Sequence, residues 1–324
     1  MKKLKKVILV LLVIFLVLGS TWLVISFIPP KQATSGLNPW RKTDQTLISA
    51  HRGGANLNPE NTEMAFDYVI NETTYTDIIE LDVRLTADNE LVIIHDASIN
   101  RTGIKGEVDE ANLLLVNDLT YNELLQYNFG VNFEKDNTKP YENLSIKEAE
   151  EVGLTIMKFE DFLIKYESSR YFRILLEIKD SKELGIKTVD IAESIIAKHS
   201  NWDDRIMTIS FSTEVVNYVL ANYKDRYVAG MGYNMVPFLA GSLLGLDCLF
   251  DVKYQSVQSS MITKAGPISI NCATQSFVDS AHARNQCVAF WTINDETDMR
   301  HLISLGVDVI TTNSPDLLAQ VLGK

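Results

Sequence analysis

The chain has 324 residues, of which 46% are hydrophobic, and its formal net charge at pH 7 is −12. That length is enough for one large domain or two small ones, and the acidic balance argues against nucleic acid as a partner. The three cysteines are widely spaced, which excludes a disulfide framework and a Cys-x-x-Cys metal motif.

The N-terminal segment is basic at its start and then strongly apolar. Four lysines lie within the first six residues, and no charged residue follows from position 7 to 28. An apolar helix of about 20 residues spans a bilayer core, and lysines that precede such a helix stay in the cytoplasm. We therefore expect residues 1–30 to form a single-pass anchor in the cell membrane, with the rest of the chain outside. A cleaved signal peptide is the alternative, although no clear Ala-x-Ala site follows.

Two prolines, Pro29 and Pro30, end the apolar helix. Residues 31–45 then indicate a tether, and the main domain is expected at 46–324. Because the four lysines contribute +4 to a total of −12, the remainder of the chain carries −16. A phosphate ligand would therefore need local positive charge, such as a metal ion, to receive it.

After the tether, short apolar runs alternate with helical patterns. Strands are expected at Thr46–Ala50, Asp77–Val83, Leu91–His95, Arg173–Ile178, Arg205–Ser210, Tyr227–Met231, Asp247–Val252, Gln286–Thr292 and Val307–Thr311. Helices are expected at Thr62–Asn71, Lys187–His199, Thr213–Asn222, Gln275–Arg284, Glu296–Leu305 and Pro315–Leu322. Such alternation indicates parallel strands that are joined by right-handed crossovers.

The number of strand–helix units is close to eight, which favours an α/β fold of the (β/α)8 TIM barrel type over an open doubly wound sheet. No Gly-x-Gly-x-x-Gly fingerprint supports the open sheet. Residues 102–155 interrupt the alternation because they are polar, with one helix-like piece at 119–126. We expect them to form a small insertion after the second strand, on the rim of the barrel.

Barrel active sites lie at the carboxyl ends of the strands. Ionisable residues close four of the predicted strands: His51 and Arg52, Glu80 and Asp82, His95 and Asp96, and Glu177 and Lys179. Four strand ends with such residues predict a catalytic site in the barrel mouth.

Three carboxylates among these residues predict a metal site. Glu80 and Asp82 are two apart on one strand, so both point to the same face, and Glu177 is placed to be a third ligand. Like charges in an apolar run repel one another unless a cation joins them. Oxygen ligands with open positions suit Mg²⁺ or Ca²⁺ better than Zn²⁺. The alternative is that these residues are exposed acids on a polar strand face.

The two strand-end histidines can divide the work of acid–base catalysis. His51 and His95 would act as general base and general acid in the hydrolysis of a phosphodiester, in an order that the sequence leaves open. Arg52 can bind a phosphate with two hydrogen bonds, and Lys179 can serve as a point charge. Trp291 would wall a substrate pocket or, equally, fill the core. The other histidines lie in helical patterns without acidic clusters and are expected to be structural.

Five separated blocks of the chain resemble one known family. They are "HRGGANLNPENTEMAF", "IIELDVRLTADNELVIIHDASINRTG", "LLEIK", "VAFWTIND" and "GVDVITTNSPD", in that order between residues 47 and 322. These blocks resemble the glycerophosphodiester phosphodiesterases, which have a TIM barrel with a small insertion after the second strand. The resemblance implies catalytic histidines at His51 and His95, and metal ligands at Glu80, Asp82 and Glu177. It also implies phosphate contacts at Arg52 and Lys179.

The resemblance implies a metal-dependent reaction that yields glycerol phosphate and an alcohol. In it, the glycerol hydroxyl next to the phosphate attacks, and a cyclic phosphate forms and is then opened by water. Two alternatives remain: a lysophospholipase D that acts on membrane lipid, and a non-catalytic barrel that binds glycerophosphoryl polymers. Two segments depart from the family pattern. Asn313 stands where the family often has aspartate, so no role is carried to it, and Gly230–Ser269 is longer and more apolar than expected.

Overall fold

In the computed structural model, which describes all residues except 1, 35, 42–43 and 266–267, eight parallel strands close into a barrel. They are, in chain order, β1 (Leu47–Ala50), β2 (Ile78–Leu85), β4 (Arg173–Ile178), β5 (Ile206–Ile209), β6 (Tyr227–Gly230), β7 (Ser256–Ser259), β10 (Cys287–Phe290) and β11 (Val309–Thr312). The barrel closes because β1 pairs with both β2 and β11. The predicted (β/α)8 TIM barrel is confirmed.

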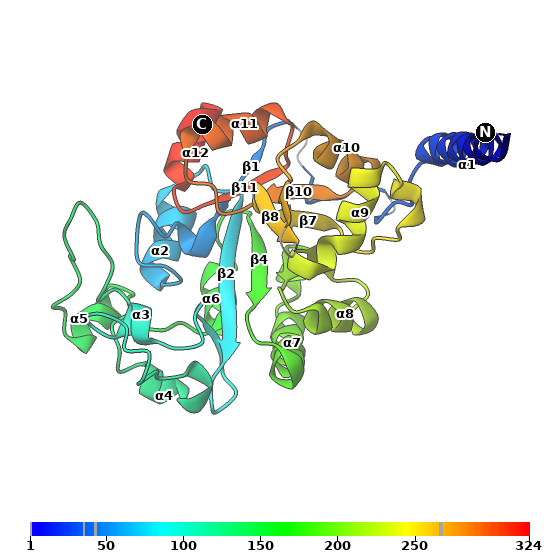
Figure 1. The fold of residues 1–324 in the computed structure, drawn as a ribbon. Coiled ribbons are helices and arrows are strands. Elements are labelled where there is room, and N and C mark those ends of the chain that lie inside the picture. The colour runs from blue at the N-terminus through cyan, green and yellow to red at the C-terminus, as the bar shows by residue number, and fades with distance from the viewer. Residues whose placement is uncertain (1, 35, 42–43, 266–267) are drawn as a thin grey trace.

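Helices surround the strands, as Figure 1 shows. They are α2 (Glu63–Asp67), α6 (Phe159–Tyr166), α7 (Lys182–Lys198), α8 (Thr213–Asn222), α9 (Val236–Leu244), α10 (Gln275–Ala283), α11 (Glu296–Ser304) and α12 (Pro315–Leu322). Side-chain oxygens cap the first turns of α2, α8, α10 and α11 at Thr62, Ser212, Thr274 and Asp295. Each cap fixes where its helix begins, at the strand–helix loops that form the barrel mouth.

The alternation of side chains along β2 decides what faces the barrel interior. Ile79, Leu81 and Val83 belong to the large core between the barrel and the helices. Ile78 belongs to a second cluster inside the barrel, so Glu80, two residues further on, also points inward. The same alternation on β4 places Glu177 inside the barrel. The interior is therefore apolar where the strands begin and acidic where they end.

Trp40 closes the floor of the barrel. It is 1% exposed and clusters with residues near the start of several strands, among them Ile78, Leu175 and Met207. Its ring packs edge-on against Tyr227, with ring centroids 6.1 Å apart. A segment that precedes the first strand thus completes the interior core and leaves only the opposite end of the barrel open.

The segment predicted as a tether lies against this floor. Ala33 N–H donates to Arg284 O at 2.9 Å. Asn38 Nδ2 lies 2.9 Å from the carbonyl oxygens of both Gln255 and Asn285. The chain is therefore bound to the barrel well before β1 begins.

One strand prediction was wrong, and another predicted strand is present but lies outside the barrel. Asp247–Val252 is not a strand, because its first residues form the 3-10 turn η6 (Asp247–Leu249), and the barrel strand is β7 instead. β7 has the sequence SVQS and is fully buried, so its polar residues hid it from a search for apolar runs. The segment predicted at Leu91–His95 contains β3 (Leu91–Ile93), which pairs antiparallel with β2 and lies outside the barrel.

The insertion is formed by short elements beside the barrel mouth. They are α3 (Asn100–Gly103), η3 (Val116–Asp118), α4 (Tyr121–Leu124) and α5 (Ile146–Glu151). A small core of their own, which includes Val116, Leu124 and Phe129, holds them together. The helix-like piece expected at 119–126 contains the single turn α4, which a capping box at Thr120 and Glu123 starts.

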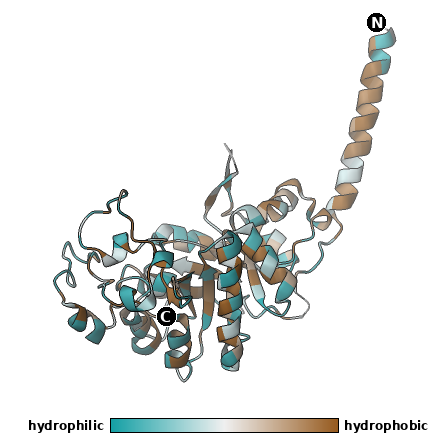
Figure 2. Cartoon of the chain, turned by 90° about the horizontal axis from the view of Figure 1, so that it is seen from below, coloured by the Kyte–Doolittle hydropathy of each residue, from teal (hydrophilic) through white to brown (hydrophobic). Residues whose placement is uncertain are grey.

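The apolar N-terminal segment forms one helix, α1 (Lys2–Ser26), which extends away from the barrel in Figures 1 and 2. Within its span from Lys3 to Ser26, an 18-residue window has a mean hydropathy of 3.0 and is 0% buried. Among the described residues, its hydrogen bonds to the body lie near its end, where Trp22 Nε1 donates to Leu244 O at 2.8 Å and Cys248 Sγ lies 3.4 Å from Ile25 O. Its length and composition would allow it to cross a membrane.

Candidate active site

Three carboxylates meet inside the barrel at the carboxyl ends of β2 and β4. Asp82 is in register with Glu177, and Glu80 lies two residues before Asp82 on the same face. One oxygen from each of the three lies within 4.8 Å of the other two. Glu80, Asp82 and Glu177 are only 3%, 1% and 8% exposed. They are therefore not exposed acids on a polar strand face.

This donor set fits a divalent cation. Asp82 Oδ1 is buried without a hydrogen-bond partner among the described residues. Burial, followed by the charges of Asp82 and Glu177, raises the pKa of Glu80 well above its usual value. Burial and then Asp82 raise the pKa of Glu177. Carboxylates held so close are stable as anions only beside positive charge, and hard oxygen donors suit Mg²⁺ or Ca²⁺.

Two basic side chains face the same carboxylates. Lys179 Nζ lies 2.7 Å from Glu177 Oε1 and 3.6 Å from Asp82 Oδ1. Arg52 Nε lies 3.3 Å from Asp82 Oδ2. Although burial opposes ionisation, Lys179 and Arg52 hold the pKa of Asp82 below its usual value. Two cationic side chains and three carboxylates therefore lie together at one end of the barrel. Such a site can hold a metal ion on its carboxylates and a phosphate on its cations.

A left-handed turn after β1 aims two predicted residues at this point. Arg52 has φ 53° and ψ 33°, and Gly53 and Gly54 continue with φ 80° and 90°, a conformation that costs glycine little. The Arg52 N–H donates to Glu80 Oε2 at 2.8 Å. The strand end thus folds back over the carboxylates, and the side chains of His51 and Arg52 line the same cavity.

The ring of His51 is oriented by Asn313. His51 Nδ1 lies 2.5 Å from Asn313 Oδ1, and its Nε2 lies 3.9 Å from Glu80 Oε2. An amide oxygen accepts a hydrogen bond, so the ring carries its proton on Nδ1 and leaves Nε2 able to accept one. Burial and then Arg52 lower the pKa of His51, which favours this neutral form.

A chain of ion pairs holds His95. Its Nδ1 lies 2.6 Å from Asp96 Oδ1, and Asp96 Oδ2 accepts from Arg101 Nε at 2.6 Å. Arg101 in turn donates to both oxygens of Glu60, which also accepts from Arg52 Nη1 at 3.0 Å. Although burial opposes it, hydrogen bonds from His95 and Arg101 hold the pKa of Asp96 below its usual range. Asp96 thus stays ionised and fixes the ring of His95.

Seven of the eight predicted site residues line one cavity of about 90 Å³, and only Asp82, the most buried of them, does not. Trp291 forms part of its wall and packs edge-on against Phe211, with ring centroids 5.5 Å apart. The remaining lining residues come from the ends of other strands, namely Ile209, Phe211, Met231, Gln258, Thr292 and Thr311. The structure therefore brings the predicted residues together.

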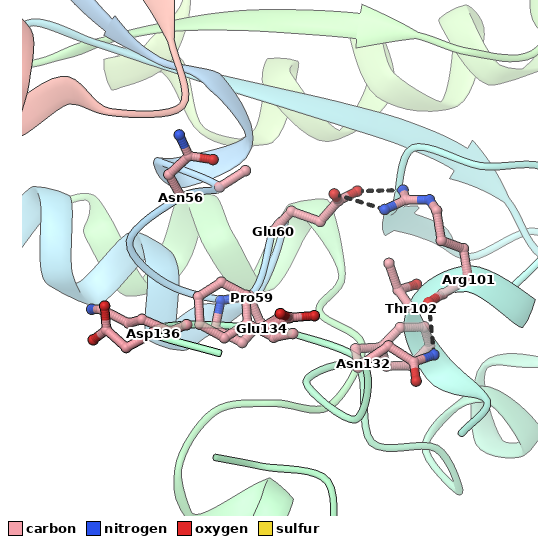
Figure 3. Close-up of a pocket in the computed structure, with 12 residues that line it drawn as sticks. Asn56, Pro59, Glu60, Arg101, Thr102, Asn132, Glu134 and Asp136 are labelled. Carbon is pink, nitrogen blue, oxygen red and sulfur yellow. Dashed lines mark hydrogen bonds and ion pairs between the residues drawn. The ribbon is translucent and has the colours of Figure 1, made fainter. Parts of the chain in front are cut away.

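A larger cavity of about 570 Å³ lies next to this site and contains none of the predicted residues. Figure 3 shows Glu60 and Arg101 reaching toward each other beside it, with Asn132, Glu134 and Asp136 of the insertion along its other side. Glu60 also accepts from Arg52, which lines the smaller cavity, so this ion pair links the linings of the two cavities. Residues of the insertion thus line a cavity beside the candidate site.

Sequence reasoning missed three residues that position the predicted ones: Asn313, Arg101 and Glu60. Each lies inside a block that resembles the family, which was the one available signal. Their roles depend on contacts between distant segments, such as the 262 positions that separate His51 from Asn313. Asn294 supports Asn313 in turn, because its Oδ1 accepts from the Asn313 N–H at 2.9 Å.

Without a cation, the contribution of Glu80 and Glu177 to the stability of the protein should fall as pH rises. The pKa values of Glu80 and Glu177 are raised in the folded state from an ordinary 4.5. Their contribution to stability is therefore complete below about pH 4.5 and is lost at higher pH. In chelator, wild type should lose free energy of unfolding relative to Glu80→Gln as the pH rises above about 4.5. Denaturant titrations of both proteins across this range measure the difference, and parallel curves would contradict the raised pKa of Glu80.

The sequence profile of the Glycerophosphoryl diester phosphodiesterase family matches residues 51–317. The chain is 29% identical to a glycerophosphodiester phosphodiesterase of Bacillus altitudinis over 287 residues, which cover 85% of this chain and 98% of that one. It is also 24% identical to the lysophospholipase D GDPD1 of Rattus norvegicus, over 84% of this chain and 85% of that one.

Solved structures share the fold. The chain is similar to a glycerophosphoryl diester phosphodiesterase of Silicibacter pomeroyi, with a TM-score of 0.67 and 19% identity over 89% of this chain and 97% of that one. The chain is also similar to a phosphodiesterase of Oleispira antarctica in complex with the product sn-glycerol-3-phosphate. The TM-score is 0.60 and the identity 19%, over 86% of this chain and 98% of that one. The profile match over residues 51–317, most of the chain, shows that the chain belongs to the glycerophosphoryl diester phosphodiesterase family.

Proposed function

We propose that the protein hydrolyses glycerophosphodiesters to glycerol phosphate and an alcohol, with Ca²⁺ or Mg²⁺ and the two histidines His51 and His95. The observation that carries this proposal is the single cavity of about 90 Å³, which both histidines line together with Arg52, Lys179 and two of the three clustered carboxylates. Its dimensions and charges suit a phosphodiester group rather than a large apolar ligand.

The phosphate is held by Arg52 and Lys179. Both are cations that face the carboxylates, and Arg52 can form two parallel hydrogen bonds to a phosphoryl group. Trp291 and Phe211 form an apolar wall of the same cavity, against which the carbon skeleton of glycerol packs. The substrate is thus oriented with its phosphate toward Glu80, Asp82 and Glu177.

A divalent cation held by Glu80, Asp82 and Glu177 would lower the pKa of the attacking glycerol hydroxyl and neutralise charge on the phosphoryl oxygens. His51, neutral and with Nε2 able to accept, takes the proton from that hydroxyl. His95, held by the ionised Asp96, gives a proton to the leaving alcohol. In the second step the two histidines exchange roles, and water opens the cyclic phosphate.

The test uses the full chain in detergent micelles with soluble glycerophosphocholine, in added Ca²⁺, in added Mg²⁺ and in chelator. Release of choline and glycerol phosphate that stops in chelator supports the proposal. Binding of glycerophosphoryl polymers without turnover under every condition would instead support the non-catalytic barrel. Turnover that continues unchanged in chelator would refute the metal-dependent mechanism.

The second candidate function is that of a lysophospholipase D. Two observations favour it: the relative of that name in Rattus norvegicus and the helix α1, which is long and apolar enough to cross a membrane. The discriminating substrate is lysophosphatidylcholine, which has an acyl chain that glycerophosphocholine lacks. Faster turnover of lysophosphatidylcholine in membranes than of glycerophosphocholine would assign this activity.

We also propose that α1 anchors the protein in the cell membrane with the barrel outside. The lysines before an uncharged run motivate this orientation. Protease added to intact cells is expected to digest the barrel while a fragment of α1 stays with the membrane. A soluble protein in the medium whose N-terminus lies between Ala33 and Trp40 would show instead that the helix is a cleaved signal.

A further inference from the structure

Large apolar side chains are exposed on two consecutive loops at the barrel mouth. Tyr233 and Val236, after β6, are 81% and 51% exposed, and Ile262, the first residue of β8 (Ile262–Ala265) after β7, is 64% exposed. These three residues are here called the apolar rim. The carboxyl ends of parallel strands share one face of a barrel, so the apolar rim borders the same mouth as the active site. Clustered exposed apolar residues commonly mark an interaction surface.

At Tyr233 the apolar rim adjoins the wall of the catalytic cavity. Phe211, which is 47% exposed, lines that cavity and packs against Trp291. Gly232, the neighbour of Tyr233, lies against the Phe211 ring, since a Cβ at Gly232 would be 3.1 Å from Phe211 Cδ1. An apolar path therefore leads from the solvent-exposed rim to the site where the phosphate is held.

The helix α1 extends to the side of the body on which the rim lies. In Figure 2 both α1 and the hairpin formed by β8 and β9 (Ile268–Asn271) extend upward from the barrel. Trp22, near the base of α1, donates to Leu244 O of the body, and tryptophan is common at the boundary between membrane and water. From Lys3 to Trp22 the helix is about 30 Å long, the thickness of a bilayer core.

We propose that the apolar rim docks into the surface of the membrane that α1 crosses, so that the barrel mouth faces the lipid headgroups. This inference deepens the proposed function and rests on it: the substrate is a glycerophosphodiester that is still part of a membrane lipid. The body without the N-terminal lysines carries a charge of −16, so it is repelled by anionic lipid. Docking must therefore come from burial of Tyr233, Val236 and Ile262, and raising the salt concentration should not release the rim.

The mechanism restricts which lipid can react. The attacking group is a free glycerol hydroxyl next to the phosphate, and a lysolipid keeps one such hydroxyl whereas a diacyl lipid has none. In the first step that oxygen bonds to phosphorus, the bond from phosphorus to the headgroup alcohol breaks, His51 takes the hydroxyl proton and His95 protonates the leaving oxygen. Water then opens the cyclic phosphate. Lysophosphatidylcholine should be cleaved and phosphatidylcholine should not.

The activity test uses the full chain in phosphatidylcholine vesicles that contain lysophosphatidylcholine, with Mg²⁺ or Ca²⁺. The rim variants are Tyr233→Asp and Ile262→Asp. The matched control is Tyr171→Asp, because Tyr171 is a tyrosine that is 54% exposed and lies before β4, at the closed end of the barrel. Each rim variant should lower turnover of the lysolipid by about tenfold or more, with turnover of soluble glycerophosphocholine unchanged and Tyr171→Asp equal to wild type.

Equal loss of both activities in the rim variants would overturn the docking proposal, because it would mean that the rim shapes the site itself. Full retention of lysolipid turnover would overturn it as well. Failure of the proposed function has a different signature, since wild type would then cleave neither substrate.

A second measurement tests docking without activity. Tyr233→Cys and Tyr171→Cys are each labelled with a polarity-sensitive dye, and the signal from the native cysteines is subtracted with labelled wild type. In vesicles, the emission of the dye at position 233 should shift to the blue and be quenched by lipids that carry a quencher, at low and at high salt alike. Equal emission from the two positions would refute docking whatever the activity.

Discussion

Replacing His51 or His95 by alanine is expected to reduce turnover of glycerophosphodiesters by about 10²–10⁴-fold each, because that is the usual contribution of one general acid or base. The fold should persist, since neither side chain belongs to a hydrophobic cluster and both line the cavity. Rates on glycerophosphocholine with added metal, together with the melting temperature of each variant, measure the effect.

The control for this experiment is His301→Ala. His301 lies on α11 and is exposed. Its ring Nε2 lies 3.3 Å from the carbonyl oxygen of Ala273. Its replacement should leave turnover unchanged. If His51→Ala or His95→Ala kept a rate near that of wild type, that histidine would be structural and the division of proton transfer between the two would be wrong.

Ca²⁺ or Mg²⁺ is expected to raise the thermal stability of wild type, and Glu80→Gln should remove most of this gain. A cation that binds only the folded state stabilises it by about 2.7 kcal/mol when its concentration is a hundred times its Kd. Glutamine keeps the shape of Glu80 and can still accept from the Arg52 N–H, which donates to Glu80 Oε2 at 2.8 Å. The substitution removes one ligand charge, so Kd should rise.

Melting curves of both proteins, in chelator and in each metal, give the answer. In chelator the variant should be at least as stable as wild type, because one repulsion among buried carboxylates is gone. Glu183→Gln, which changes an exposed carboxylate in the first turn of α7, controls for the lost charge alone. A wild-type melting temperature indifferent to both cations, with activity that survives in chelator, would eliminate the metal site.

The sequence predicted the fold best where apolar residues alternate with a few charged ones. On β2, the run IIELDV shows at once which side chains enter the core and that Glu80 and Asp82 share the other face. β7 could not be found in this way. All four residues of its SVQS sequence are buried although three are polar, and one of these, Gln258, lines the catalytic cavity. A search for apolar runs cannot find such a strand.

The residues that line the candidate site could be predicted from the sequence, but most of the residues that orient them could not. Residues that close strands converge in any parallel barrel, which is why His51, Glu80 and Glu177 could be placed together before their positions were known. The groups that orient them are set by packing between distant loops. Asn313 reaches His51 from the loop after the last strand, and Arg101 reaches Asp96 and Glu60 from α3. No local pattern encodes such contacts.

If α1 is a membrane anchor, as proposed above, the way the chain enters the barrel limits how far the enzyme can move from it. Six residues separate Ser26, the end of α1, from Ala33, which is already bound to the barrel floor. Fully extended, that segment covers about 25 Å at most. An enzyme held by α1 therefore samples a thin layer over the bilayer, where lipid headgroups are far more concentrated than in the surrounding solution. Its rate would depend on the surface density of substrate in the membrane rather than on the bulk concentration of substrate.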